Sequence, residues 1–480
     1  MKRMNLLVMS LVSAAALSFT SCSSNDDLAG NAGQAKVDQF YMTLTIQTPN
    51  SNGTRTVVNK PTVDATAAES DVTSGTFYLV DANNKIVFKK SISKEEWAEK
   101  KIPTQGTNGK TTLQVPVENV TAGTKYSVYF LANSESASPL TDVYTSDLAN
   151  KFAKAYSTAN NFAMFNENDA DVKGNSHTVV FTSDNKDANS AAKVSSTINI
   201  ERLTARIDEP KSAVSTIQPY AEDAEVSDEQ KEANKKAVEA VKSLKLTRYA
   251  ISNVANKTNV MQQWADATTL SIPTGITYFQ PTSEFGTKTL LQNDNYFKTV
   301  DKSHKDYVFE NNSSDAATSM YFEYTVELSD DYKKDADFKD GTFYRYNKVI
   351  YSSIQDIIDA YKDVKAIFNG QTKDAVIAEL TAAKNDTTDP EAKLDEFRKK
   401  YDIEVFNNGK TYYVQKIQDQ YLGVANTIQR NSIYLLNVKN IFNVGAQVPN
   451  GGPDDRTLYY LDVEVSVNPW VLNSYDVDLQ

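Results

Sequence analysis

Alternation of apolar and polar residues is the strongest pattern in this 480-residue chain, and it is typical of β-strands with one buried face. The segment 40–46 shows it first, and its apolar side consists of Phe40, Met42, Leu44 and Ile46. Residues 75–90 then predict a hairpin that turns at Asn83 and Asn84. With the strand patterns that continue to residue 207, these segments predict a first β-rich domain.

The alternation also reaches the very end of the chain, where frayed polar residues are usual. It runs through 461–467 and resumes with Tyr475, Val477 and Leu479. Between these stretches, Trp470 is interpreted as a core residue, and Pro469 as the point where the strand leaves its sheet. The tail therefore either pairs within its own sheet or fills a hydrophobic site in another molecule.

Helical patterns interrupt the second half of the chain. Ser227 and Gln230 predict a capping box, and the helix after it has one apolar stripe. The stripe consists of Ala233, Ala237, Val241 and Leu244. Two or three more helices are expected within 353–401, one from Ser353 to Gly370 and another opened by Pro390. We therefore predict a mainly β fold with two domains, 56–207 and 208–480, and with helical insertions in the second.

Composition and charge narrow the function. Tyr and Phe are abundant, at 26 and 20 residues, which favours strands. The net charge is −12, and it becomes −14 when Lys2 and Arg3 are removed with the leader. Nucleic acid is therefore not expected as a partner, because phosphate binding needs a basic face.

The start of the chain has the features of a bacterial secretion signal. A basic tip precedes the apolar stretch 6–19, and the only cysteine, Cys22, follows at the expected cleavage position. We predict a lipoprotein signal peptide at 1–21 and lipidation of Cys22, which would anchor the precursor in the outer membrane. The alternative is an ordinary signal peptide followed by an incidental cysteine.

The search for chemistry returns little. The two histidines, His177 and His304, stand in contexts that suggest structural or solvated side chains, and no hydrolase, nucleotide or zinc motif accompanies them. The stretch 169–175 has the first half of a calcium loop but lacks the closing glutamate. We expect no enzyme activity, no cofactor and no metal.

Several segments together resemble a known family. They are "FYMTLTIQTPNSNGTR", "YSVYFLAN", "NFAMFNEND", "INIERLTARI", "GTFYRYNKVIYSS", "IQRNSIYLLNVKNI" and "NPWVLNSYDVDL". The most telling are the R-N-x-x-Y pattern of Arg430, Asn431 and Tyr434 and the ending at Trp470. Over nearly the whole mature chain the sequence is similar to the fimbrilins of Bacteroidetes, the subunits of type V pili, and it resembles the minor-fimbrium major-subunit family.

The resemblance implies two transthyretin-like β-sandwich domains and a particular maturation. An Arg-specific protease would cut between Arg55 and Thr56 and remove the propeptide 22–55, which includes the first strand. The position of Phe40, Met42, Leu44 and Ile46 would then accept the donor strand of a neighbour, with Tyr475, Val477 and Leu479. Physical reasoning supports this exchange, since a sheet that lacks one strand exposes unpaired backbone groups that a donated strand satisfies. Because donor and acceptor are different surfaces, the contact builds an open filament.

The predicted function is that of a stalk subunit of a cell-surface fimbrium, acting in adhesion, colonisation and biofilm. Its partners would be copies of itself, accessory anchor and tip subunits, the protease, and receptors on host or bacterial surfaces. One alternative is a monomeric surface lipoprotein that binds glycans. The other is a tip or anchor subunit of the same pilus.

Overall fold

The structure is a computed structural model, and strands dominate it. It describes residues 38–48, 63–102, 110–134, 143–145, 157–158, 161–168, 175–266, 269–282, 296–364, 367–419, 422, 424–449 and 461–471. Six predicted site residues lie outside the described residues: Cys22, Arg55, Thr56, Tyr475, Val477 and Leu479.

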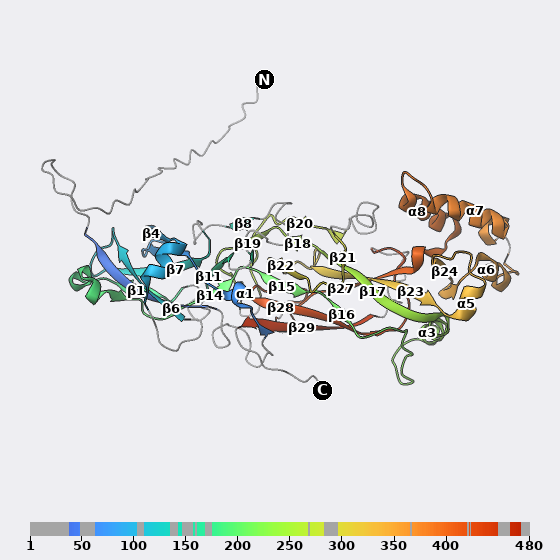
Figure 1. The fold of residues 1–480 in the computed structure, drawn as a ribbon, viewed down its shortest axis with the longest axis horizontal. Coiled ribbons are helices and arrows are strands. Elements are labelled where there is room, and N and C mark those ends of the chain that lie inside the picture. The colour runs from blue at the N-terminus through green and yellow to red at the C-terminus, as the bar shows by residue number, and fades with distance from the viewer. Residues whose placement is uncertain are drawn as a thin grey trace, which may run out of the picture. The chain divides into compact units, whose positions relative to one another are not determined.

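In the first half of the chain, one sheet runs in the order β4-β3-β7-β11-β14-β1-β6-β5, with β12 paired to β7 and β13 paired to β1. Figure 1 shows β1 beside β6 in this sheet. Its strands are β1 (Phe40–Gln47), β3 (Gly75–Val80), β4 (Ile86–Ile92), β5 (Lys101–Ile102), β6 (Lys110–Val117), β7 (Lys125–Ala132), β11 (Met164–Asn166), β12 (Thr178–Val180), β13 (Ala192–Lys193) and β14 (Ile198–Arg202).

Shorter elements complete this half. They are α1 (Ala67–Ser70), α2 (Lys94–Lys100), β9 (Ser157–Thr158), β10 (Asn161–Phe162) and the 3-10 turns η3 (Ser183–Lys186) and η4 (Ala188–Ser190). Strands from the two sides of the large sheet share one core, because Met42 and Leu44 of β1 belong to the same buried cluster as Phe77 of β3 and Phe130 of β7. The sheet therefore bends over itself and encloses this core.

The part of the chain from Ala205 onward, called here the second half, forms two larger sheets, one of which also includes β2 from the start of the described chain. One has the order β2-β29-β28-β15-β22, with β16 paired to β28, and the other has the order β21-β17-β23-β27. Their strands are β2 (Val63–Asp64), β15 (Ala205–Asp208), β16 (Lys211–Ser212), β17 (Val241–Ser252), β21 (Lys298–Thr299), β22 (Lys305–Val308), β23 (Ser319–Leu328), β27 (Lys410–Lys416), β28 (Ser432–Ile441) and β29 (Leu461–Val471). Buried side chains of both sheets, such as Tyr434 and Phe322, form one cluster, which is the packing of a β-sandwich.

Small sheets and helices surround this sandwich. The strands β18 (Val254–Ala255) and β20 (Tyr278–Phe279) pair with each other, and β19 (Lys257–Asn259) pairs with β8 (Val143–Thr145) of the first half. An insertion between β23 and β27 has a core of its own. Its elements are α5 (Asp330–Lys334), β24 (Phe343–Tyr346), β25 (Val349–Tyr351), α6 (Ile354–Ala360), η6 (Ile367–Gly370), α7 (Lys373–Lys384), α8 (Pro390–Tyr401), β26 (Glu404–Phe406) and η7 (Asn407–Gly409).

The predicted fold class, mainly β with sandwich packing and helical insertions, is confirmed. The strands change from one half's sheet to the other between Arg202 and Ala205. The exact domain limits, 56–207 and 208–480, stay a prediction, and residues 39–480 form one compact unit.

Two predicted helices are shorter than the sequence suggested. The capping box of Ser227 and Gln230 is present, but α3 (Asp228–Ala240) ends before Val241, which begins β17. The helix that starts after Ser353 ends at Ala360 rather than at Gly370, and Val364 beyond its end is exposed. Apolar spacing alone could not show these ends, since Val241 is buried whether it continues a helix or starts a strand.

Candidate assembly site

The first strand, β1, occupies a central position in the sheet of the first half. It pairs antiparallel with β6 along its whole length, from Phe40 opposite Val117 to Gln47 opposite Lys110. On its other side it pairs in parallel with β13 and then with β14. Because β1 has partners on both sides, its loss would leave a gap inside the sheet rather than a shortened edge.

The side chains of β1 alternate as the sequence predicted. Phe40, Met42, Leu44 and Ile46 are each at most 3% exposed, and the residues between them are half-buried. Full burial of one such side chain contributes roughly 1.5–3 kcal/mol. The strand therefore contributes four side chains to the core of the first half, and its departure would expose an apolar strip.

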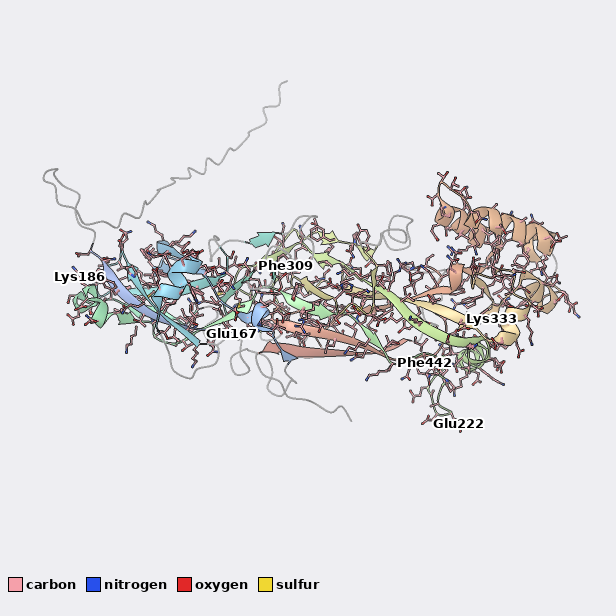
Figure 2. The ribbon with its side chains drawn as sticks, viewed as in Figure 1. Glu167, Lys186, Glu222, Phe309, Lys333 and Phe442 are labelled. Carbon is pink, nitrogen blue, oxygen red and sulfur yellow. The ribbon has the colours of Figure 1, made fainter. Side chains whose placement is uncertain are left out.

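Several contacts secure β1 within its position. The Phe40 ring packs edge-on against Phe181 with ring centroids 5.6 Å apart, and the Lys186 ammonium lies 5.5 Å from the Phe40 ring centroid. Lys186, labelled in Figure 2, ends η3. In the middle of the strand, the Thr45 and Thr112 hydroxyls are 2.9 Å apart, within hydrogen-bond distance. The Val194 N–H donates to the Thr43 carbonyl oxygen.

The last described strand, β29, lies in the other half. It pairs antiparallel with β28 from Leu461 opposite Ile441 to Pro469 opposite Ser432 (Figure 1). It continues to Trp470 and Val471, which pair in parallel with Val63 and Asp64 of β2. The interpretation of Pro469 as the exit from the sheet is therefore wrong. Proline lacks only the N–H, so a strand tolerates it where that group would face away from its neighbour.

A buried charged cluster joins the two halves near α1. The Glu69 carboxylate accepts from Arg206 Nη1 at 3.0 and 3.1 Å and from the Tyr307 hydroxyl at 2.8 Å. Arg202, which is fully buried, donates from Nη1 to Asn431 Oδ1 at 2.8 Å and from Nε to the Glu69 carbonyl oxygen at 2.7 Å. Arg202, the last residue of β14, thereby links the sheet of the first half to Asn431, which directly precedes β28.

The R-N-x-x-Y pattern has a structural role at this junction. Arg430 is buried, forms an ion pair with Glu310 at 2.9 Å and donates to backbone carbonyls of the segment 259–260. Asn431 adopts a positive φ of 55° and receives Arg202. The Tyr434 hydroxyl accepts from the Gln429 N–H at 2.8 Å, which closes the turn before β28.

Sequence reasoning found β1 and the R-N-x-x-Y pattern but missed Glu69, Arg202 and Arg206. A signal did exist for Arg202. It continues the alternating face of Ile198 and Ile200, where a further apolar residue would be expected. A charged residue on a buried face needs a partner, and nothing in the sequence indicates that the partner is α1.

Of the residues considered for chemistry, His177 and His304 are both described. His177 is buried, and its Nδ1 lies 2.8 Å from the Ser196 hydroxyl. Among the described residues, no three His, Cys, Asp or Glu side chains are grouped so that they could hold a metal ion. No helix in the described part of the chain is long and apolar enough to cross a membrane.

Comparison with known proteins finds a family similarity for part of the chain. Residues 404–476 match the family model described as major fimbrial subunit protein type IV, fimbrillin, C-terminal. This range includes β27, β28 and β29. The match confirms the predicted resemblance to fimbrilins. It supports a structural, non-enzymatic fimbrial subunit at the cell surface.

Solved structures similar to this chain come from Parabacteroides distasonis. One protein assigned to cell adhesion has 11% identity and a TM-score of 0.43, with 92% of this chain and 99% of that chain covered. A second has 13% identity and a TM-score of 0.45, with 91% and 100% covered. A fimbrial assembly protein has 14% identity and a TM-score of 0.29, with 61% and 85% covered. A search of curated proteins gave no match.

Proposed function

We propose that this protein is a stalk subunit of a surface fimbrium and that it polymerises by exchange of β1 for the C-terminal tail of a neighbour. The observation that carries the proposal is the position of β1, a strand with one fully buried face at the N-terminal end of the described chain and with ladder partners on both sides. Few strands in such a position could be removed without loss of the fold, unless another strand replaces them.

The tail has the spacing that this replacement requires. Tyr475, Val477 and Leu479 alternate with polar residues, as Phe40, Met42 and Leu44 do in β1. Within one precursor, β1 is favoured because it is tethered to its own sheet and has a high effective concentration. Cleavage between Arg55 and Thr56 would cut that tether and let the tail of a neighbour compete.

Sequencing of the N-terminus of assembled fimbriae tests this maturation. Mature subunits should begin at Thr56, and Arg55→Ala should give a folded precursor that does not polymerise. Fimbriae whose subunits begin at Ser23 or still contain Phe40 would contradict the proposal.

In the same strain, Cys22→Ala should abolish incorporation of labelled fatty acid into the precursor, and persistent labelling would exclude Cys22 as the lipidated residue.

The proposed biological role is adhesion, colonisation and biofilm formation from the outer membrane surface. Anchor and tip subunits, the Arg-specific protease and surface receptors are the proposed partners. Electron microscopy of cells with and without this chain tests the role, because a stalk subunit should determine whether fimbriae are present at all. A glycan-binding monomer would leave the fimbriae unchanged.

A further inference from the structure

The segment 63–70, named here the anchor segment, follows the proposed cleavage site and is bonded at both of its ends. It contains β2 and α1. At its start, Val63 and Asp64 pair in parallel with Trp470 and Val471, the last two residues of β29. The proposed donor tail begins directly after them. The anchor segment therefore pairs with Trp470 and Val471, the two residues that precede the proposed donor tail and are named here its root.

The other end of the anchor segment is held by Glu69, whose side chain is 4% exposed. Besides Arg206 and Tyr307, its carboxylate receives the Lys305 ammonium at 3.2 Å and the Thr66 N–H at 2.9 Å. The three side-chain donors come from β15 and β22, in the same sheet as β29. Glu69 thus fastens α1 to the sheet from which the tail emerges.

Arg202 holds the backbone of the same helix from the first half. Its Nε donates to the Glu69 carbonyl oxygen, and its Nη2 donates to the Ser70 hydroxyl at 2.9 Å. The next residues are held as well, since Asn133 Nδ2 donates to the Asp71 carbonyl oxygen at 2.7 Å. These bonds do not involve β1, which pairs with β6, β13 and β14 in a different sheet from β2.

We propose that the anchor segment remains in place when β1 leaves, and that Glu69 is a positioning residue that keeps the root of the donor tail in register. This inference rests on the proposed strand exchange. A tail that emerges from a fixed root searches a smaller volume for its acceptor, so less conformational entropy is lost on assembly. Cleavage would release one strand and leave intact the segment that presents the other.

Hydrogen exchange measured by mass spectrometry tests the inference on the full precursor, before and after cleavage with an Arg-specific protease. The informative peptides cover 63–70 and 468–471. In the cleaved wild type, both peptides should exchange as slowly as in the precursor. Glu69→Gln should accelerate both by about tenfold or more, because it removes a hydrogen-bonded charge. If that variant does not fold, Tyr307→Phe should accelerate the same peptides by about fivefold, the effect of one hydrogen bond.

A matched control separates positioning from general stability. Glu404→Gln removes the carboxylate of another ion pair, in which the half-buried Glu404 accepts from Nε and Nη2 of the buried Arg345. It should accelerate exchange in β24 and β26 and leave 468–471 unchanged. Rapid exchange of 63–70 in the cleaved wild type, or unchanged exchange of 468–471 in Glu69→Gln, would overturn the inference.

Electron microscopy of the same samples keeps the two proposals distinguishable. Cleaved wild type that forms no filaments would refute strand exchange, whatever the exchange rates are. Filaments together with fast exchange at the anchor segment would refute the anchor alone. If the anchor acts as proposed, Glu69→Gln should also form filaments more slowly than Glu404→Gln.

Discussion

Burial disfavours the charged form of a carboxylate, so a buried glutamate such as Glu69 stays charged only if nearby donors and cations stabilise it. Burial by itself would raise the pKa of Glu69. The Arg206 guanidinium, the Thr66 N–H, the Tyr307 hydroxyl and the Lys305 ammonium together lower that pKa to about 2, from an ordinary value of 4.5. The opposite balance holds at Glu201, whose pKa is well above its usual range. Burial raises this pKa most, Glu167 and Glu310 raise it further, and the opposing effect of Arg430 is too small to restore it. Charged Glu69 is therefore part of the stable folded state.

The first prediction concerns acid. Because the folded-state pKa of Glu69 is below the unfolded value, its contribution is complete above the unfolded pKa and is lost as the pH falls from about 4.5 towards about 2. The free energy of unfolding of wild type should exceed that of Glu69→Gln by up to roughly 3 kcal/mol at neutral pH. Urea unfolding of both proteins at a series of pH values measures the difference, which should shrink below about pH 4.5.

An exposed glutamate provides the control for this pH series. Glu232 pairs with Lys236 on α3 at 3.8 Å, and its side chain is 60% exposed. Glu232→Gln should change the free energy of unfolding by less than about 1 kcal/mol at every pH. A difference between wild type and Glu69→Gln that stayed constant down to about pH 3 would show that the carboxylate charge is not what matters.

At the scale of elements, structure that depends on neighbouring residues could be predicted from the sequence, whereas contacts between residues far apart in the chain could not. The alternation of β1, the turn at Asn84 with its positive φ of 59°, and the capping box of α3 depend on neighbouring residues, and all three are present. The Glu69–Arg206 and Arg202–Asn431 contacts join residues 137 and 229 positions apart. No periodic pattern encodes such a pairing. The position of β1 between β14 and β6 was equally out of reach, because alternation shows which face is buried but not which strands are adjacent.

The second prediction separates the precursor from the assembled state through two leucines that face each other. Leu44 of β1 lies opposite Leu113 of β6, and each is at most 1% exposed. Leu44→Ala should lower the stability of the precursor by about 2–5 kcal/mol, as cavities of this kind do. In assembled fimbriae the same substitution should have no effect if β1 is removed as proposed.

Leu113→Ala is the matched variant, since β6 follows the proposed cleavage site and would remain in the mature subunit. It should weaken the precursor and the fimbriae alike. Denaturant unfolding of the precursor and the temperature at which purified fimbriae dissociate give the two readouts. Fimbriae weakened by Leu44→Ala would mean that β1 stays in the filament.

At the scale of the whole molecule, the two proposed surfaces of assembly belong to different halves. The β1 position lies in the sheet of the first half, and β29, which leads to the tail, lies in a sheet of the second. The buried contacts of Arg202 with Asn431 and of Arg430 with Glu201, the latter at 3.8 Å, connect the halves, and residues 39–480 form one compact unit. A subunit with separate acceptor and donor surfaces adds head to tail, and such addition builds an open filament unless the rotation per subunit closes a ring.

The last prediction follows from that separation. Deletion of residues 472–480 keeps β29 complete to Val471, including its pairing with Asp64. The truncated subunit should fold, be cleaved after Arg55 and remain monomeric, because it can accept a strand but cannot donate one. Mixed with cleaved wild type, it should shorten the fimbriae in proportion to its fraction, since each truncated copy ends a filament.

Two variants with intact apolar spacing control for the loss of the tail. Asp476→Ala and Asp478→Ala change only the polar positions between the donor residues, so they should still assemble. Filament lengths measured by electron microscopy then separate the remaining possibilities. Wild-type lengths in every mixture would show that 472–480 is not the donor, whereas truncated copies that assemble on their own would place the donor strand elsewhere in the chain. Shortening that follows the truncated fraction would mean that each subunit must donate its tail for the filament to grow, which is the behaviour required of a stalk subunit and not of a monomeric surface lipoprotein.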